Sequence, residues 1–232
     1  MKAKQIKNTE ITPENISACF RDLIENQIDW SSLLAGEAEA LSEEQKREKI
    51  YSTLDRLSGE MGKAAQQGLQ EFTKRDKSGK ISKQLSDFEQ FVTDAKIAEA
   101  GDLITDEIFA TMIKMANDTY RDGEASEAAA MYSFLQVVQP LAVEPMIGQL
   151  TIEWEQRGAE RAADLYEAVV DLLKNPMLDM FGAECLLAAK RKERARALRE
   201  RALKNLTEDE DFRTEYADIE PDVRELLKEI NA

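Results

Sequence analysis

Apolar residues recur every three or four positions along most of the chain, the spacing that places them on one face of an α-helix. In the first half this pattern predicts helices over about residues 14–28, 43–61, 85–95 and 106–116. Helix-start signals precede three of them: Thr12 with Pro13, Ser42 with Gln45, and Thr105. The polar segment 73–83 predicts a turn or linker. We therefore expect an all-α protein.

Beyond about residue 100 the helical stretches become shorter and are punctuated by glycine and proline. Gly158 follows Gly123 by 35 positions, and Lys190 stands where a third glycine would fall, 32 positions further on. Small or apolar residues recur seven or eight positions before, five after and twelve after these three residues: Ala116, Leu150 and Ala183; Ala128, Ala163 and Ala195; Leu135, Val170 and Ala202.

This period predicts helical hairpins, because glycine turns the chain without strain and small residues let two helices approach. Residues 115–140 are then two helices rather than one; an irregular bundle in which the glycines recur by chance is the alternative. Stacked hairpins would bury a common core and leave a concave groove lined by the first helix of each pair. We expect an N-terminal helical region at 1–102, three repeats at 103–206 and an acidic helix or tail at 207–232.

The composition argues against several classes of partner and of chemistry. The chain of 232 residues carries 31 basic and 46 acidic residues and a net charge of −15, which disfavours nucleic acid and anionic membranes as partners. Histidine is absent, which removes the usual general base and the commonest zinc ligand. Two distant cysteines, Cys19 and Cys185, form no disulfide framework. With no signal peptide or long apolar span in view, we expect a cytoplasmic protein.

Three local segments partly match motifs of specific chemistry. Residues 74–85 resemble a calcium loop, but Lys74 and Leu85 replace its required acids, so we interpret the segment as a turn. Residues 59–65 lack the spacing of a phosphate loop. The run 190–204 holds eight basic residues, yet an apolar line passes through it, which favours a solvated outer helix face. We expect no catalytic residues, no metal site and no cofactor.

Two segments, "LITDEIFATMIKMANDTYRDGEASEAAAMYSFLQVVQP" and "NPMLDMFGAECLLAAKRKERARA", carry a family resemblance. They resemble the class II chaperones of type III secretion systems (the SycD/LcrH group) over about residues 103–206. The resemblance implies three tetratricopeptide repeats, a cytoplasmic location and a secreted translocator protein as partner. Residues 1–102 and the acidic tail are outside it.

The resemblance also implies a groove that holds an extended peptide of the partner. The residues it assigns to that groove are Ile113, Asn117, Tyr120, Arg121, Gly148, Ile152, Glu155, Gln156, Met180, Glu184 and Leu187. For Tyr120, packing inside the hairpin is an equal alternative, and Met146 and Met180 also suit a core.

The expected function is a chaperone that holds a secreted translocator before type III secretion. A tetratricopeptide-type scaffold or regulatory adaptor that binds a folded partner is the alternative. No direct insertion into a membrane is expected, and a homodimer is left open.

Overall fold

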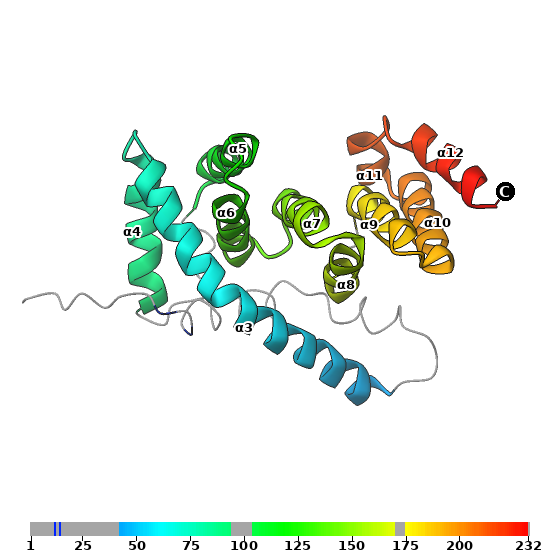
Figure 1. Ribbon diagram of the computed structural model, residues 1–232, viewed down its shortest axis with the longest axis horizontal. Coiled ribbons are helices and arrows are strands. Elements are labelled where there is room, and N and C mark those ends of the chain that lie inside the picture. Colours follow the sequence, from blue (N-terminus) through cyan, green and yellow to red (C-terminus); the bar gives the residue numbers. More distant parts are fainter. Residues whose placement is uncertain (1–11, 13, 15–41, 94–103, 170–174, 232) are drawn as a thin grey trace, which may run out of the picture. The chain divides into compact units, whose positions relative to one another are not determined.

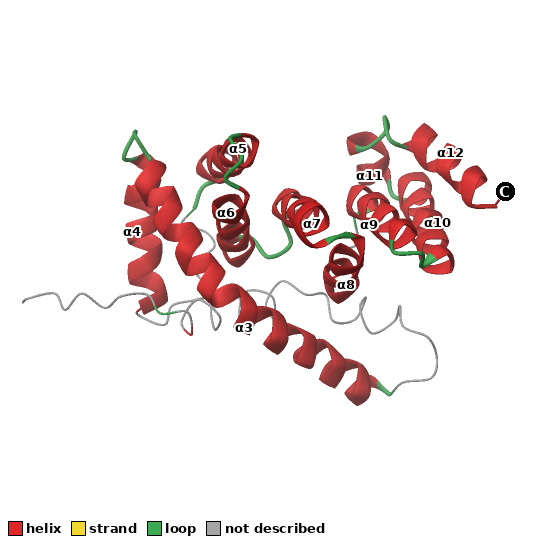
Figure 2. Cartoon of the chain, in the orientation of Figure 1, coloured by secondary structure: helices red, strands yellow, loops and turns green. Residues whose placement is uncertain are grey.

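The computed structural model describes residues 42–93, 104–169 and 175–231, together with residues 12 and 14. Within these ranges the chain forms ten helices and no strand, so the all-α prediction is confirmed (Figure 1, Figure 2). The helix predicted over residues 14–28 lies outside the described residues, except for residue 14, and so does the predicted boundary between residues 102 and 103. Contacts divide the chain into two compact units, residues 1–140 and 141–232. Each unit is described by itself.

Helix α3 (Glu43–Arg75) is more than twice as long as each other described helix of unit 1. It starts at the predicted capping box: Gln45 N–H donates to Ser42 Oγ at 3.3 Å, and Ser42 N–H donates to Gln45 Oε1 at 2.9 Å. The linker predicted over residues 73–83 is shorter in the structure, because α3 runs on to Arg75 and helix α4 (Lys80–Thr93) begins soon after.

The turn between α3 and α4 is organised by the Asp76 carboxylate. It accepts hydrogen bonds from the backbone N–H groups of Ser78, Gly79 and Ser82 at 2.9, 3.1 and 2.7 Å. The hydroxyl groups of Ser78 and Ser82 donate to the same carboxylate. One side chain thus satisfies two amides of the turn and one amide in the first turn of α4, which explains why so short a turn suffices.

Helices α5 (Asp106–Arg121) and α6 (Ala125–Val138) form a hairpin, and α6 packs between α5 and α3 (Figure 1). The predicted N-cap of α5 is confirmed, since Thr105 Oγ1 accepts from the Ile108 amide at 3.4 Å. Residues 130–138 of α6 are all buried.

The contact between α3 and α6 depends on a missing side chain. A Cβ on Gly68 would lie 2.0 Å from the backbone oxygen of Ala130, so only glycine allows the two backbones this close. Beside this contact, the ring of Phe134 on α6 lies 5.9 Å from Phe72 of α3 and 5.5 Å from Phe88 of α4. The core of unit 1 therefore gathers around α6.

Unit 2 contains two further hairpins, α7 (Val143–Arg157) with α8 (Ala159–Val169) and α9 (Pro176–Ala188) with α10 (Lys192–Glu208). Helix α9 packs on α10 and also on α7 and α8, so consecutive hairpins stack. Pro176 stands at the first position of α9, behind an Asn175 cap that accepts from two backbone amides.

The acidic C-terminal segment is helical. Helices α11 (Glu210–Glu215) and α12 (Glu220–Asn231) both pack on α10. Val223 of α12 is fully buried against Ala202 and Leu206 of α10. The segment thus covers one side of α10 in the last hairpin. None of the helices in the described ranges is long and apolar enough to cross a lipid bilayer.

Candidate functional site

All three predicted turn residues have a left-handed backbone, with φ of 86° at Gly123, 91° at Gly158 and 63° at Lys190. The prediction that residues 115–140 form two helices is therefore confirmed. At the first turn, Gly123 N–H donates to Tyr120 O and Glu124 N–H donates to Thr119 O, at 3.0 and 3.2 Å. This pair of bonds is the Schellman motif that ends many helices.

The third turn repeats these bonds with a different residue. Lys190 N–H donates to Leu187 O at 2.9 Å, and Arg191 N–H donates to Leu186 O at 2.8 Å. The second turn differs, because Gly158 N–H donates to Trp154 O and α8 begins at the next residue. The first and third turns are thus the matching pair, although Lys190 breaks the glycine pattern.

The residues that recur around the turns lie inside the hairpins. Eight of the nine repeat positions are in the described residues, and each is fully buried: Ala116, Ala128, Leu135, Leu150, Ala163, Ala183, Ala195 and Ala202. Val170 lies outside the described residues. The helices of a pair therefore meet where small side chains were expected to allow it.

On α5, the predicted groove residues have different surroundings. Asn117 accepts a hydrogen bond from the buried Tyr132 hydroxyl of α6 at 2.5 Å, so it has a role within the hairpin. Arg121 is exposed and pairs with Asp118 at 3.0 Å. Ile113 and Tyr120 are half-buried, which leaves part of each side chain accessible to a partner.

On α7, the predicted residues range from buried to exposed. Ile152 is only 4% exposed and belongs to the core, as does Met146 at 3%. Gly148 is half-buried, while Glu155 and Gln156 are exposed. At the predicted positions of α7, a ligand would therefore meet Gly148 and the polar side chains of Glu155 and Gln156.

On α9, two of the three predicted residues contact α10 or α12. Met180 is half-buried and packs against the cluster of Ala202, Leu206 and Val223. Glu184 pairs with Arg199 of α10. Leu187 is half-buried. Because the first helix of the first hairpin belongs to unit 1 and the other two to unit 2, a single groove across all three stays a prediction.

The basic run on α10 faces inward more than expected. The prediction of a solvated outer face is wrong for Arg199, which is fully buried, and for Arg201, whose guanidinium bonds a buried carboxylate on α9. The reason is that α9 supplies acids at the facing positions, Glu184 and Asp179. Arg196 and Lys204 instead form exposed pairs along α10.

A buried polar network joins α8, α9 and α10. The Tyr166 hydroxyl donates to Asp179 Oδ1 at 2.8 Å, and Arg201 Nε donates to Asp179 Oδ2 at 2.8 Å. Burial, together with the charge of Asp179, raises the pKa of Tyr166. The ring of Tyr166 lies against Gly182, where a Cβ would approach it to 2.2 Å. Because these polar groups bond one another, we interpret the network as a structural element rather than a reactive centre.

A second ionic contact fastens the third turn to the preceding hairpin. Arg191 donates to Glu160, Asp164 and Glu167 of α8 at 2.7, 2.7 and 2.6 Å. The hydrogen bonds that Arg191 donates to Asp164 and Glu160 raise the pKa of Arg191. The stacking of the second and third hairpins therefore has an electrostatic part that salt should weaken.

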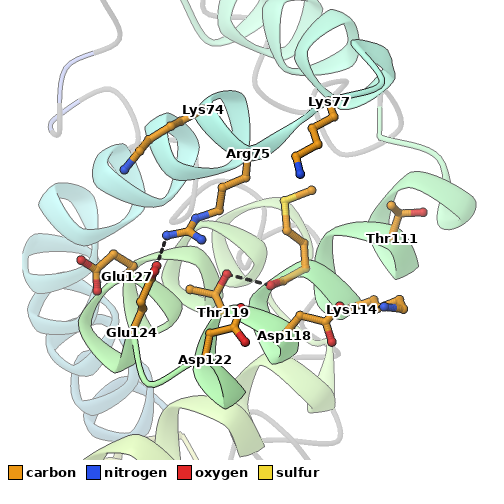
Figure 3. A pocket seen from close by; sticks show the side chains of 11 residues that line it. Lys74, Arg75, Lys77, Thr111, Lys114, Asp118, Thr119, Asp122, Glu124 and Glu127 are labelled. Carbon is orange, nitrogen blue, oxygen red and sulfur yellow. Dashed lines mark hydrogen bonds and ion pairs between the residues drawn. The ribbon is translucent and has the colours of Figure 1, made fainter.

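An open pocket of about 780 Å³ lies in unit 1 between the end of α3, the face of α5 and the start of α6 (Figure 3). Its lining was not predicted from the sequence, since its charges come from three separate segments. The residues are Lys74, Arg75, Lys77, Thr111, Lys114, Met115, Asp118, Thr119, Asp122, Glu124 and Glu127.

The remaining chemistry-bearing groups are structural or shielded. Burial would raise the pKa of Asp76, but hydrogen bonds from the Ser82 backbone and the Ser78 hydroxyl lower it to about 2. Burial raises the pKa of the Cys185 thiol to about 12. Within the described ranges no group of three or more His, Cys, Asp or Glu side chains could hold a metal ion.

Comparison with family models, curated proteins and solved structures finds no match.

Proposed function

We propose that this chain is a peptide-binding protein of helical hairpins that acts as a chaperone for a secreted translocator protein. The observation that carries the proposal is the recurrence of left-handed turns at Gly123, Gly158 and Lys190, each between two antiparallel helices. Such hairpins, stacked side by side, form the surfaces on which repeat proteins hold extended segments. The family resemblance over residues 103–206 supplies the class of partner.

The proposed peptide contacts are half-buried apolar residues on the first helix of a hairpin. In unit 1 they are Ile113 and Tyr120 of α5, and in unit 2 the contact is Leu187 of α9. A partly exposed apolar side chain can lose its remaining contact with water when a ligand covers it, which favours binding. The polar side chains of Glu155 and Gln156 would then bond the peptide backbone.

The test is co-expression with each protein encoded by the genes next to its own. The expected result is that one of them stays in the supernatant and co-purifies with the chain. Leu187→Ala should weaken that complex, whereas Leu165→Ala, a half-buried leucine on the second helix α8, should not. Equal effects of these two matched variants, or no co-purifying partner, would refute the proposal.

An adaptor that binds a folded partner is the second candidate. It is favoured by the roles that Asn117, Ile152 and Glu184 already have within their hairpins, because these leave fewer groups for a peptide. In that case the co-purified partner would keep its fold without the chain, as measured by circular dichroism after separation.

A further inference from the structure

The pocket of unit 1 lies on the side of α5 opposite to Ile113 and Tyr120, the two α5 residues proposed to contact the peptide, whereas the predicted groove residue Arg121 pairs with the pocket residue Asp118. Its α5 residues, such as Met115 and Asp118, are two positions away from the predicted groove residues Ile113 and Tyr120. Two positions correspond to a rotation of about 200° around the helix axis. A ligand in the pocket would therefore leave the proposed groove face of α5 free.

Most charges that line the pocket are neutralised by a neighbour. Arg75 bonds Glu71 at 3.1 Å and also reaches Glu124, as the dashed line in Figure 3 shows. Lys74 pairs with Glu71 at 3.3 Å, and Lys114 pairs with Asp118 at 2.6 Å. These pairs fix the walls of the pocket and offer little net charge to a ligand.

Three lining charges remain: Lys77, Asp122 and Glu127. No hydrogen bond or ion pair joins their side chains to any other described residue. Lys77 extends toward the pocket from the turn that follows α3, while Asp122 is the C-cap residue of α5 and Glu127 lies in the first turn of α6 (Figure 3). The pocket therefore presents one free positive and two free negative charges from opposite walls.

The wall between these charges is partly apolar. The Met115 side chain is half-buried and forms part of the pocket lining. A methionine adapts its shape to different apolar groups. Pockets for small molecules are mostly apolar and enclosed, and this one is charged and open, so its chemistry suits the side chains of another protein.

We propose that this pocket binds a short peptide segment of a partner protein in which an acidic and a basic side chain flank an apolar one. The acidic side chain pairs with Lys77, the basic one with Asp122 and Glu127, and the apolar one covers Met115. The free charges set the orientation of the segment, because the reversed order would place like charges together. The site is separate from the groove of the proposed function.

The test is selection of a random seven-residue peptide library on the full-length chain, with a parallel selection on the variant Lys77→Glu/Asp122→Lys/Glu127→Lys. Peptides that only the unmodified chain retains should carry one acid and one base around an apolar residue. Their Kd should rise about tenfold in the single variant Lys77→Glu, since a weak attraction becomes a repulsion. High salt should also weaken the binding of these peptides to the unmodified chain.

The matched control is Lys83→Glu/Asp87→Lys, which alters two exposed charges on α4 outside the pocket. This control should leave the peptides bound, and so should Leu187→Ala. Failure of the pocket proposal can therefore be distinguished from failure of the proposed groove. The methyl NMR signal of Met115, assigned with Met115→Leu, should shift when a peptide binds. Identical peptide pools from both selections, or a Met115 signal that does not move, would overturn the proposal.

Discussion

The first and third hairpins turn with the same hydrogen bonds, but different chemistry holds them together. In the first, the buried residues of α6 are mostly apolar, and a glycine contact brings α3 against it. In the third, α10 is rich in charge, and its arginines reach Glu184 and Asp179 on α9. The turn therefore defines each hairpin, while the neighbouring helices decide what its interior contains.

The two interiors should respond differently to the loss of one polar group. Apolar burial stabilises by roughly 25 cal/mol per Å² and tolerates small changes of shape. A buried ion pair contributes little net stability, yet removing one partner leaves the other without compensation. The third hairpin should therefore be the more sensitive of the two.

The largest expected effect is that of Asp179→Ala, which deprives Arg201 and the Tyr166 hydroxyl of their shared acceptor. The free energy of unfolding should fall by about 3–5 kcal/mol. Urea unfolding followed by Trp154 fluorescence, in a Trp30→Phe background, measures it in unit 2. The counterpart in the first hairpin, Asn117→Ala, should cost about 1 kcal/mol. Equal losses would show that the two interiors do not differ as described.

The next effect is that of Gly68→Ala, which places a methyl group against the backbone of α6. Because a backbone cannot move aside as a side chain can, a loss of about 3 kcal/mol is expected. The thermal midpoint by circular dichroism should drop, while exposed Gln67→Ala on the same helix should leave it almost unchanged. A normal midpoint for Gly68→Ala would mean that α3 and α6 are further apart.

Substitutions at the two matching turns should have a smaller effect on stability, with opposite signs at the two turns. Gly123→Ala should destabilise by about 1 kcal/mol, because alanine resists a left-handed backbone. Lys190→Gly should stabilise by about the same amount, since it removes that strain from the third turn. Lys190→Ala keeps the strain and serves as the control. Chemical denaturation measures all three, and a destabilising Lys190→Gly would contradict the common geometry.

The smallest expected effect is the pH dependence that Asp76 gives to the stability of unit 1. The pKa of Asp76 is about 2 in the folded chain and near 3.8 without the turn, so the folded state favours its charged form. Its contribution is therefore present above about pH 4 and is lost as the pH falls toward 2. For so exposed a turn we expect no more than about 1 kcal/mol. The protection factors of the α4 amides against hydrogen exchange, taken relative to the intrinsic rate at each pH, should fall over this range in the unmodified chain and less in Asp76→Asn.

Features that depend on a few neighbouring residues could be predicted from the sequence. The Ser42 and Thr105 caps and the turn at Gly123 all form within six residues of chain, so local pattern suffices to find them. The close approach at Gly68 carried no such signal, because its cause is Ala130, sixty-two positions away. The same holds for the free charges of the pocket, which three separate segments bring together.

By itself, the sequence determined that this protein is helical and where its hairpins turn, since periodicity and backbone preference act locally. Only the tertiary structure decided which polar side chains face inward. Arg199 and Arg196 lie on one helix and look alike in sequence, yet the first is buried and the second exposed. The physical reason is that a charge can be buried only where another helix supplies its partner, and Glu184 of α9 does so for Arg199 alone of these two.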